Sequence, residues 1–304
     1  YFNINLLFSM IGFYGIYKFY LVTKEHVHKN ELSIFLLLVI IALPNFHYWT
    51  SILSKDVLIF FFLSMFLFYS FSKKNNDSLF WFVLLTFIVA TLIRPYFGII
   101  FTLSYIISFI ITKNNFKIDI KLLSIAVLLL FLFFKLSIFY YPIFDRVDKL
   151  GDHNGNILIL IDNFFNYRLE LTSLGYFFDY EDSNYFTRFI SYLFVPLHLN
   201  NFDPKNIFTF LNNFVQLCVM IFLIINITLN YKFIKKASLS IFVNTKNQTK
   251  KLCLLVFIFI FLFLYSNTTS NYGIIMRQKE TIMFIFYFYL IIFYSKILHL
   301  KKNT

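Results

Sequence analysis

Arginine is the residue of this 304-residue sequence whose placement points most directly to chemistry. Arg94 comes directly before Pro95 between two apolar runs, and Arg277 lies in NYGIIMRQKE ahead of the final run. A guanidinium group binds phosphate through paired hydrogen bonds and stays charged, whereas lysine is a hydrated point charge. We therefore predict that Arg94 and Arg277 together bind a pyrophosphate head group at a membrane boundary. The alternative is that each arginine only contacts lipid phosphates.

A second candidate is the segment PNFHYWTSILSKDVLIFF, residues 44–61. Lys55 and Asp56 open an apolar run there, after an aromatic and polar turn that contains His47 and Trp49. A carboxylate can accept the proton of an attacking hydroxyl group, and aromatic rings suit the C–H faces of sugars. The segment therefore predicts an acid–base or ion-pair element, Lys55–Asp56, beside a sugar pocket.

Two carboxylates are candidates for the catalytic base. Asp56 is one, and Glu280, three residues after Arg277, is the other. Asp56 or its neighbour Ser54 could instead cap the helix that begins there. No cysteine–histidine spacing matches a zinc site, and GxGxxG, P-loop and GxSxG motifs are missing. We therefore expect no metal, no nucleotide and no other cofactor.

The composition excludes a soluble enzyme, because 59% of the residues are hydrophobic, only 14% are charged and the mean hydropathy is +0.72. Soluble domains average about 45–50% apolar and about 25% charged residues. The apolar runs do not alternate with polar residues, so helices rather than barrel strands must cross the lipid. We predict an all-α polytopic transmembrane helix bundle of about nine spans (eight to eleven), at 1–22, 32–46, 56–72, 79–93, 95–113, 121–142, 207–230, 252–266 and 281–297.

Lysine placement predicts the orientation. Most of the lysines fall in alternate short loops and at the C-terminus, which the positive-inside rule assigns to the cytoplasm. All five arginines and most of the acids then lie on the outer side. The net charge of +12 therefore indicates which loops face the cytoplasm, and nucleic-acid binding is not expected.

The chain is predicted to be a single integral membrane domain over residues 1–304, with an extracytoplasmic loop at 145–205. Within this loop, 156–178 has the apolar spacing of an amphipathic helix, and 186–199 is apolar but too short to span, as in a re-entrant helix. Because the sequence opens at Tyr1 inside an apolar run, we expect it to be N-terminally truncated.

These motifs resemble, in order, those of bacterial O-antigen and capsular polysaccharide polymerases, which are polytopic lipid-linked-sugar glycosyltransferases. The matching residues are Trp49, Ser51, Lys55 and Asp56, then Arg94-Pro95, then Asn271, Gly273 and Arg277. Where the family pattern has an Arg-Pro pair in a further outer helix, this chain has Val195-Pro196, and Arg188 is the candidate to replace that arginine.

The resemblance implies an enzyme of the bacterial inner membrane that joins polyprenyl-diphosphate-linked oligosaccharides on its outer side. Arg94, Arg277 and Arg188 would bind the diphosphate, with Lys55, His47 and Trp49 lining the substrate site and Asp56 or Glu280 acting as base. Membrane lipids are expected partners, together with a chain-length regulator or a flippase. Two alternatives are a polyprenyl-phosphate-sugar-dependent glycosyltransferase and a flippase or transporter of lipid-linked sugars.

The orientation is testable by cysteine labelling in a background with Cys218 and Cys253 replaced by Ala. In intact cells, Asn154→Cys should react with an impermeant thiol reagent, whereas Asn247→Cys should react only after permeabilisation. Labelling of Asn247→Cys in intact cells would reverse the predicted orientation.

Overall fold

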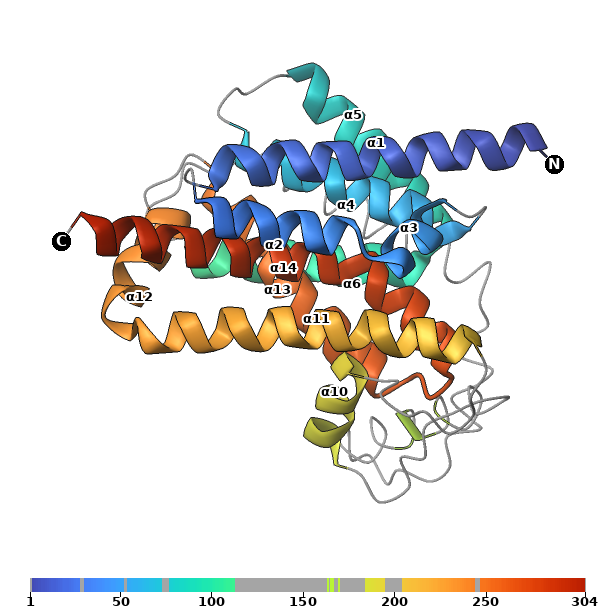
Figure 1. Ribbon diagram of the computed structural model, residues 1–304. Coiled ribbons are helices and arrows are strands. Elements are labelled where there is room, and N and C mark those ends of the chain that lie inside the picture. The colour runs from blue at the N-terminus through green and yellow to red at the C-terminus, as the bar shows by residue number, and fades with distance from the viewer. Residues whose placement is uncertain are drawn as a thin grey trace.

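The regular elements of the described residues are helices, as the composition predicts. The structure is a computed structural model that describes residues 2–27, 30–51, 54–72, 77–112, 163, 165–166, 169, 184–194, 204–243 and 247–303. Figure 1 shows the helices over these residues, which are α1 (Phe2–His26), α2 (Glu31–Ile41), α3 (Pro44–Ser51), α4 (Lys55–Phe71), α5 (Asp77–Ile93), α6 (Pro95–Thr112), α10 (Tyr185–Phe194), α11 (Pro204–Leu229), α12 (Tyr231–Ser238), the π-helix η3 (Leu239–Val243), α13 (Gln248–Ser266) and α14 (Tyr272–Lys302).

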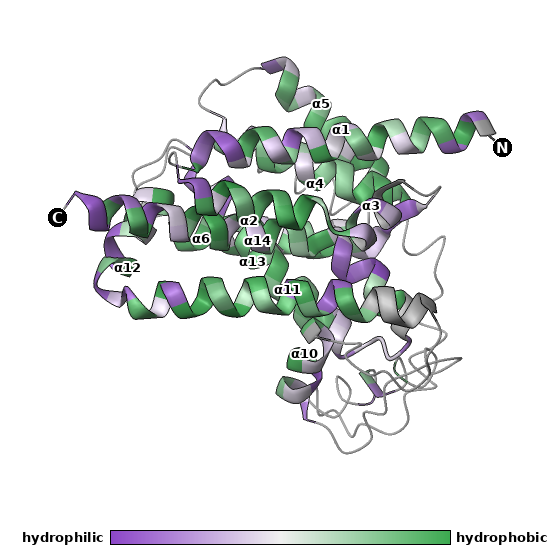
Figure 2. Cartoon of the chain, viewed as in Figure 1, coloured by the Kyte–Doolittle hydropathy of each residue, from purple (hydrophilic) through white to green (hydrophobic). Residues whose placement is uncertain are grey.

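Five of these helices are long and apolar enough to cross a membrane, as expected of a membrane-embedded protein. They are Asn3–His26, Pro95–Thr112, Phe210–Leu229, Gln248–Ser266 and Ile274–Lys302. Large apolar side chains point away from the bundle, with Phe13 70% and Leu229 73% exposed. Such exposure is unusual for a water-facing surface and suits lipid. Figure 2 shows hydrophobic residues along the middle of the helices and hydrophilic residues mainly toward their ends.

The predicted nine spans remain a prediction, because only part of them matches helices of sufficient length. The run at 32–46 is divided: α2 has 11 residues and ends at Ile41, and α3 begins at Pro44. The residues predicted to form an aromatic turn are therefore helical, since proline fits the first turn of a helix. Helices α4 and α5 have 17 residues each, shorter than the ~20 a span needs. The run at 121–142 lies outside the described residues.

The predicted loop at 145–205 lies mostly outside the described residues, and so does most of the amphipathic segment at 156–178. Within 186–199, the described part belongs to α10, which packs against α13. Its depth relative to the lipid stays a prediction.

Helix α14 is the centre of the bundle (Figure 1). It packs against α1, α2, α3, α4, α11, α12 and α13. Aromatic edge-to-face contacts join it to its neighbours: Phe284 lies 5.2 Å from Phe19 of α1 and 4.7 Å from Phe60 of α4, measured between ring centroids. Such pairs add about 0.5–1.5 kcal/mol each beyond their burial. The abundant phenylalanine thus forms a specific core around α14.

Helices α1 and α4 approach each other closely at Gly15. A Cβ atom at this position would lie 2.8 Å from Cε1 of Phe60 and 3.5 Å from Cα of Phe61. Phe60 is fully buried and packed against Phe284, so its ring has little room to move. Small residues allow helices in membranes to pack at short range.

We predict that Gly15→Val destabilises the protein by about 1–3 kcal/mol, because overpacking a filled contact costs this much. Thermal unfolding in detergent should show a lower midpoint than the wild type. Met10→Val, on the exposed side of the same helix at 63% exposure, is the matched control and should change the midpoint little. Equal midpoints for both variants would contradict close packing at Gly15.

Candidate functional site

One buried carboxylate joins two arginines that are far apart in the sequence. Oδ1 of Asp56 lies 2.7 Å from Nη2 of Arg94, and Oδ2 of Asp56 lies 2.9 Å from Nε of Arg277. Asp56 sits in the first turn of α4, Arg94 between α5 and α6, and Arg277 in the second turn of α14. We call Asp56, Arg94 and Arg277 the arginine clamp.

The backbone around Arg94 is held on both sides. Its N–H donates to the carbonyl of Ala90 at 2.9 Å, and its carbonyl accepts from the N–H of Phe97 at 3.0 Å. Pro95 begins α6 directly after it, at the helix position where proline's missing N–H costs nothing. Phe97 is buried with its ring centroid 5.6 Å from that of Phe62 on α4. This packing holds the beginning of α6 against the middle of α4.

Arg277 is positioned by a capped helix start. The side chain of Asn271 accepts a hydrogen bond from the N–H of Ile274 at 3.2 Å, which is the geometry of an N-cap. Ile275 and Met276 are buried, and α14 packs directly on α4. The first turns of α14 therefore lie beside Asp56.

The three side chains of the arginine clamp differ in their exposure to solvent. The side chain of Asp56 is 2% exposed, that of Arg94 15% and that of Arg277 37%. Burial disfavours the ionised carboxylate and is the largest effect on it, and the positive charges of Arg94, Arg277 and Lys55 offset part of this cost. Three cations thus act on one carboxylate, and the clamp carries an excess of positive charge on its more exposed side.

The clamp leaves donors for a ligand. A guanidinium group has five N–H donors, and Asp56 engages one nitrogen of each arginine. The remaining donors of Arg94 and Arg277 can bind an anion with two or more oxygens, such as a diphosphate.

The partners of Asp56 are not those of a helix-capping residue or of a catalytic base without ion pairs. Ser54 occupies the N-cap position of α4 but makes no capping hydrogen bond through its side chain. Each carboxylate oxygen of Asp56 instead faces a guanidinium group. This geometry suits a carboxylate that positions the arginines.

The other predicted site residues on α3 and α4 do not belong to the arginine clamp. Lys55 is exposed at the first position of α4, and His47 is exposed on α3 with its ring 6.1 Å from that of Phe46. Trp49 also lies on α3, but its side chain is outside the described part of the structure. A sugar pocket formed by these residues stays a prediction. In the described part of the chain, no group of three or more His, Cys, Asp or Glu residues could hold a metal ion.

Arg188 does not belong to the arginine clamp. It is buried on α10, with its guanidinium group 5.8 Å from the ring centroid of Tyr185. Among the described residues, Asp56 forms ion pairs with Arg94 and Arg277 only. The structure thus gives two of the three predicted arginines a common partner.

Glu280 also lies in a different cluster. It is 3% exposed and accepts hydrogen bonds from Nδ2 of Asn212 at 3.2 Å and from Nε2 of Gln216 at 2.7 and 2.9 Å. Its neighbour Lys279 is fully buried and donates to Oδ1 of Asn213 at 3.1 Å and to the carbonyl of Leu193 at 3.2 Å. This polar network joins α14 to α11 and α10.

Asn212, Asn213 and Gln216 were not singled out from the sequence, where asparagine is abundant and uninformative. Their signal is their spacing, since positions 212, 213 and 216 share one face of the apolar helix α11. Amide side chains in such a helix must find hydrogen-bond partners away from lipid. The adjacent charges of Lys279 and Glu280 at the start of the last run are the matching partners.

Comparisons with known proteins add no relative to this description. No protein-family model, no curated protein and no solved structure matches the chain.

Proposed function

We propose that the arginine clamp binds the diphosphate of a lipid-linked sugar and that the chain is a polysaccharide polymerase of the glycosyltransferase type. The observation that carries the proposal is the pairing of Arg94 and Arg277 through the carboxylate of Asp56, at 2.7 and 2.9 Å. Fixed guanidinium groups stabilise charge that develops on a leaving group without having to reorganise.

The location of the clamp is consistent with such a substrate. It lies where α4, α6 and α14 begin, and the lysine pattern predicts that this end faces outward. With 31 residues, α14 is about 46 Å long, whereas the hydrocarbon core of a bilayer is about 30 Å thick. Its first turns can therefore reach the level of lipid head groups, where a polyprenyl diphosphate presents its charge.

The proposed reaction transfers a glycan between two lipid-linked sugars. The oxygen of an acceptor hydroxyl attacks the anomeric carbon of the donor, and a new glycosidic C–O bond forms. The bond from that carbon to the diphosphate breaks, and the polyprenyl diphosphate leaves with the electron pair. The hydroxyl proton passes to a base. Arg94 and Arg277 balance the charge on the departing diphosphate.

The geometry favours Asp56 as the residue that positions the two arginines. Glu280, the second candidate base, accepts its hydrogen bonds from Asn212 and Gln216. Two paired guanidinium groups match a diphosphate better than a single phosphate, which favours the polymerase over a polyprenyl-phosphate-sugar-dependent enzyme. The enzyme would act in a bacterial inner membrane with a polyprenyl-diphosphate-linked oligosaccharide as substrate.

The first test replaces each arginine by lysine. If Arg94 and Arg277 bind the diphosphate through paired hydrogen bonds, Arg→Lys should reduce polymer formation at least tenfold, nearly as much as Arg→Ala. The measurement is polysaccharide length on a gel after complementation of a gene deletion, at matched protein levels in the membrane. Lys301→Ala, an exposed cation at the other end of α14, is the control and should keep full activity. Full activity in both Lys variants would contradict paired binding of a diphosphate. Positive charge that attracts lipid phosphates would then be the role of these residues.

The second test separates the positioning role of Asp56 from a role as base. In a vesicle assay with a diphosphate-linked donor, Asp56→Asn should raise KM about tenfold or more and leave the pH profile of kcat unchanged. Loss of a general base would instead lower kcat by about 10²–10⁴ and remove a limb of that profile.

A further variant excludes simple misfolding. The triple variant Asp56→Asn, Arg94→Gln and Arg277→Gln removes the buried carboxylate charge together with both of its partners, so it should fold and reach the membrane at normal levels but make no long polymer. Normal polymer length in this variant would assign the clamp a purely structural role.

A further inference from the structure

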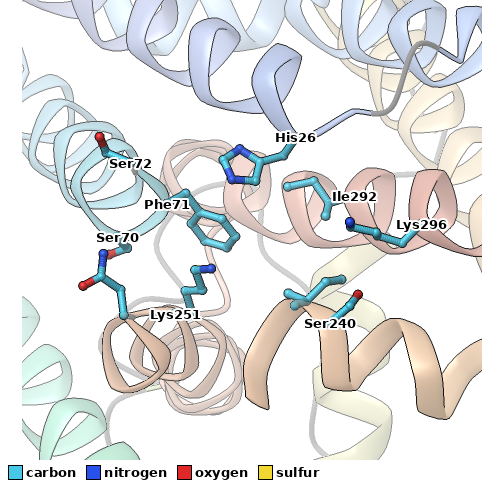
Figure 3. A pocket seen from close by; sticks show the side chains of 10 residues that line it. His26, Ser70, Phe71, Ser72, Ser240, Lys251, Ile292 and Lys296 are labelled. Carbon is cyan, nitrogen blue, oxygen red and sulfur yellow. The ribbon is translucent and has the colours of Figure 1, made fainter. Parts of the chain in front are cut away.

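A second polar site lies at the opposite end of the bundle. Helix α4 carries Asp56 in its first turn and Ser70 in its last, about 21 Å apart at 1.5 Å per residue. A cavity of about 330 Å³ opens beside Ser70, between the ends of α1, α4 and α14, the start of α13 and the π-helix η3. Figure 3 shows His26, Lys251 and Lys296 around it.

The lining of this cavity is positively charged. The polar residues that line it are His26, Ser70, Ser72, Ser240, Asn247, Lys251 and Lys296, and none of the lining residues is acidic. Lys251 is only 7% exposed, and the charge of Lys296 acts unfavourably on it. The Lys251 ammonium lies 4.6 Å from the ring centroid of Phe71, and no ion pair or hydrogen bond of this group occurs within the described residues.

Contacts with the surrounding backbone and side chains hold the polar groups of this cavity in place. Nδ1 of His26 donates to the carbonyl of Val22 at 2.9 Å, and its ring packs on that of Phe71 at 5.2 Å. Helix α13 begins at the cavity, and the side chain of its N-cap residue Asn247 makes no capping hydrogen bond. The first N–H groups of a helix carry partial positive charge and suit an anion.

We infer that this cavity is a binding site for a phosphate group, held between Lys251 and Lys296. An anion there neutralises two cations that otherwise repel each other, and hydrogen bonds from ammonium groups to phosphate are charge-assisted. The volume suits a head group or a small phosphate compound. A neighbouring cavity of about 630 Å³, lined by Lys24, His299 and Lys302, also contains Glu25 and lacks this uniform charge. The site is separate from the arginine clamp and does not depend on the proposed function.

The phosphate can come from a lipid or from solution, and two assays on the full chain distinguish these sources. In the lipid arm, native mass spectrometry compares retention of phosphatidylglycerol with that of phosphatidylcholine. In the soluble arm, thermal unfolding in detergent is measured with inorganic phosphate against sodium chloride of equal ionic strength. Lys251→Met and Lys296→Met remove the charges with little change in volume, and Lys301→Met is the exposed control at the same end.

Binding in either arm that weakens about tenfold or more in both site variants, and stays unchanged in Lys301→Met, supports the site and identifies the source. If Lys251→Met fails to fold, Lys296→Met carries the same test, because Lys296 is only partly buried. No response to either probe in the wild type, or equal binding by Lys296→Met and Lys301→Met, overturns the inference.

Discussion

A buried carboxylate in an apolar bundle needs compensating charge, and this need governs the arrangement at one end of the molecule. Asp56 obtains it from Arg94 and Arg277, which reach it from two other parts of the chain. Leaving a buried charge without a partner is strongly destabilising. The start of α4, the junction of α5 and α6, and the start of α14 are therefore held together by one interaction. Because the arginines are more exposed than the carboxylate they share, the interaction also presents their charge outward.

The two ends of the bundle use cations differently. The end with the clamp pairs its arginines with a carboxylate and holds them in a fixed orientation. The opposite end carries lysines, several of which lie over aromatic rings, as Lys250 does over Tyr69 at 4.0 Å and Lys251 over Phe71. Guanidinium groups suit oriented binding of an anion, whereas ammonium groups on flexible stems act as point charges. Helix α14 runs between these two environments.

Much of the helical fold could be predicted from composition, because apolar runs in lipid have few alternatives. The span count could not, since Pro44 divides one run and a run of 17 residues is ambiguous in length. Asp56, Arg94 and Arg277 were each identified from residue type and local context. Their contact was beyond sequence reasoning, because no local pattern relates residues that lie so far apart in the chain. The partners of Glu280 were missed for a similar reason, since asparagine and glutamine carry no charge signal.

The central place of α14 has a consequence for biosynthesis. This helix follows every other described helix in the chain, yet its neighbours α1, α2 and α4 come from the first quarter. Chains are synthesised from the N-terminus, so those helices enter the membrane long before the helix that fills the space between them. During this interval Asp56 can pair with Arg94 alone, and the aromatic surfaces that later cover Phe284 face lipid or one another. Final packing of the bundle must therefore wait for the insertion of α14.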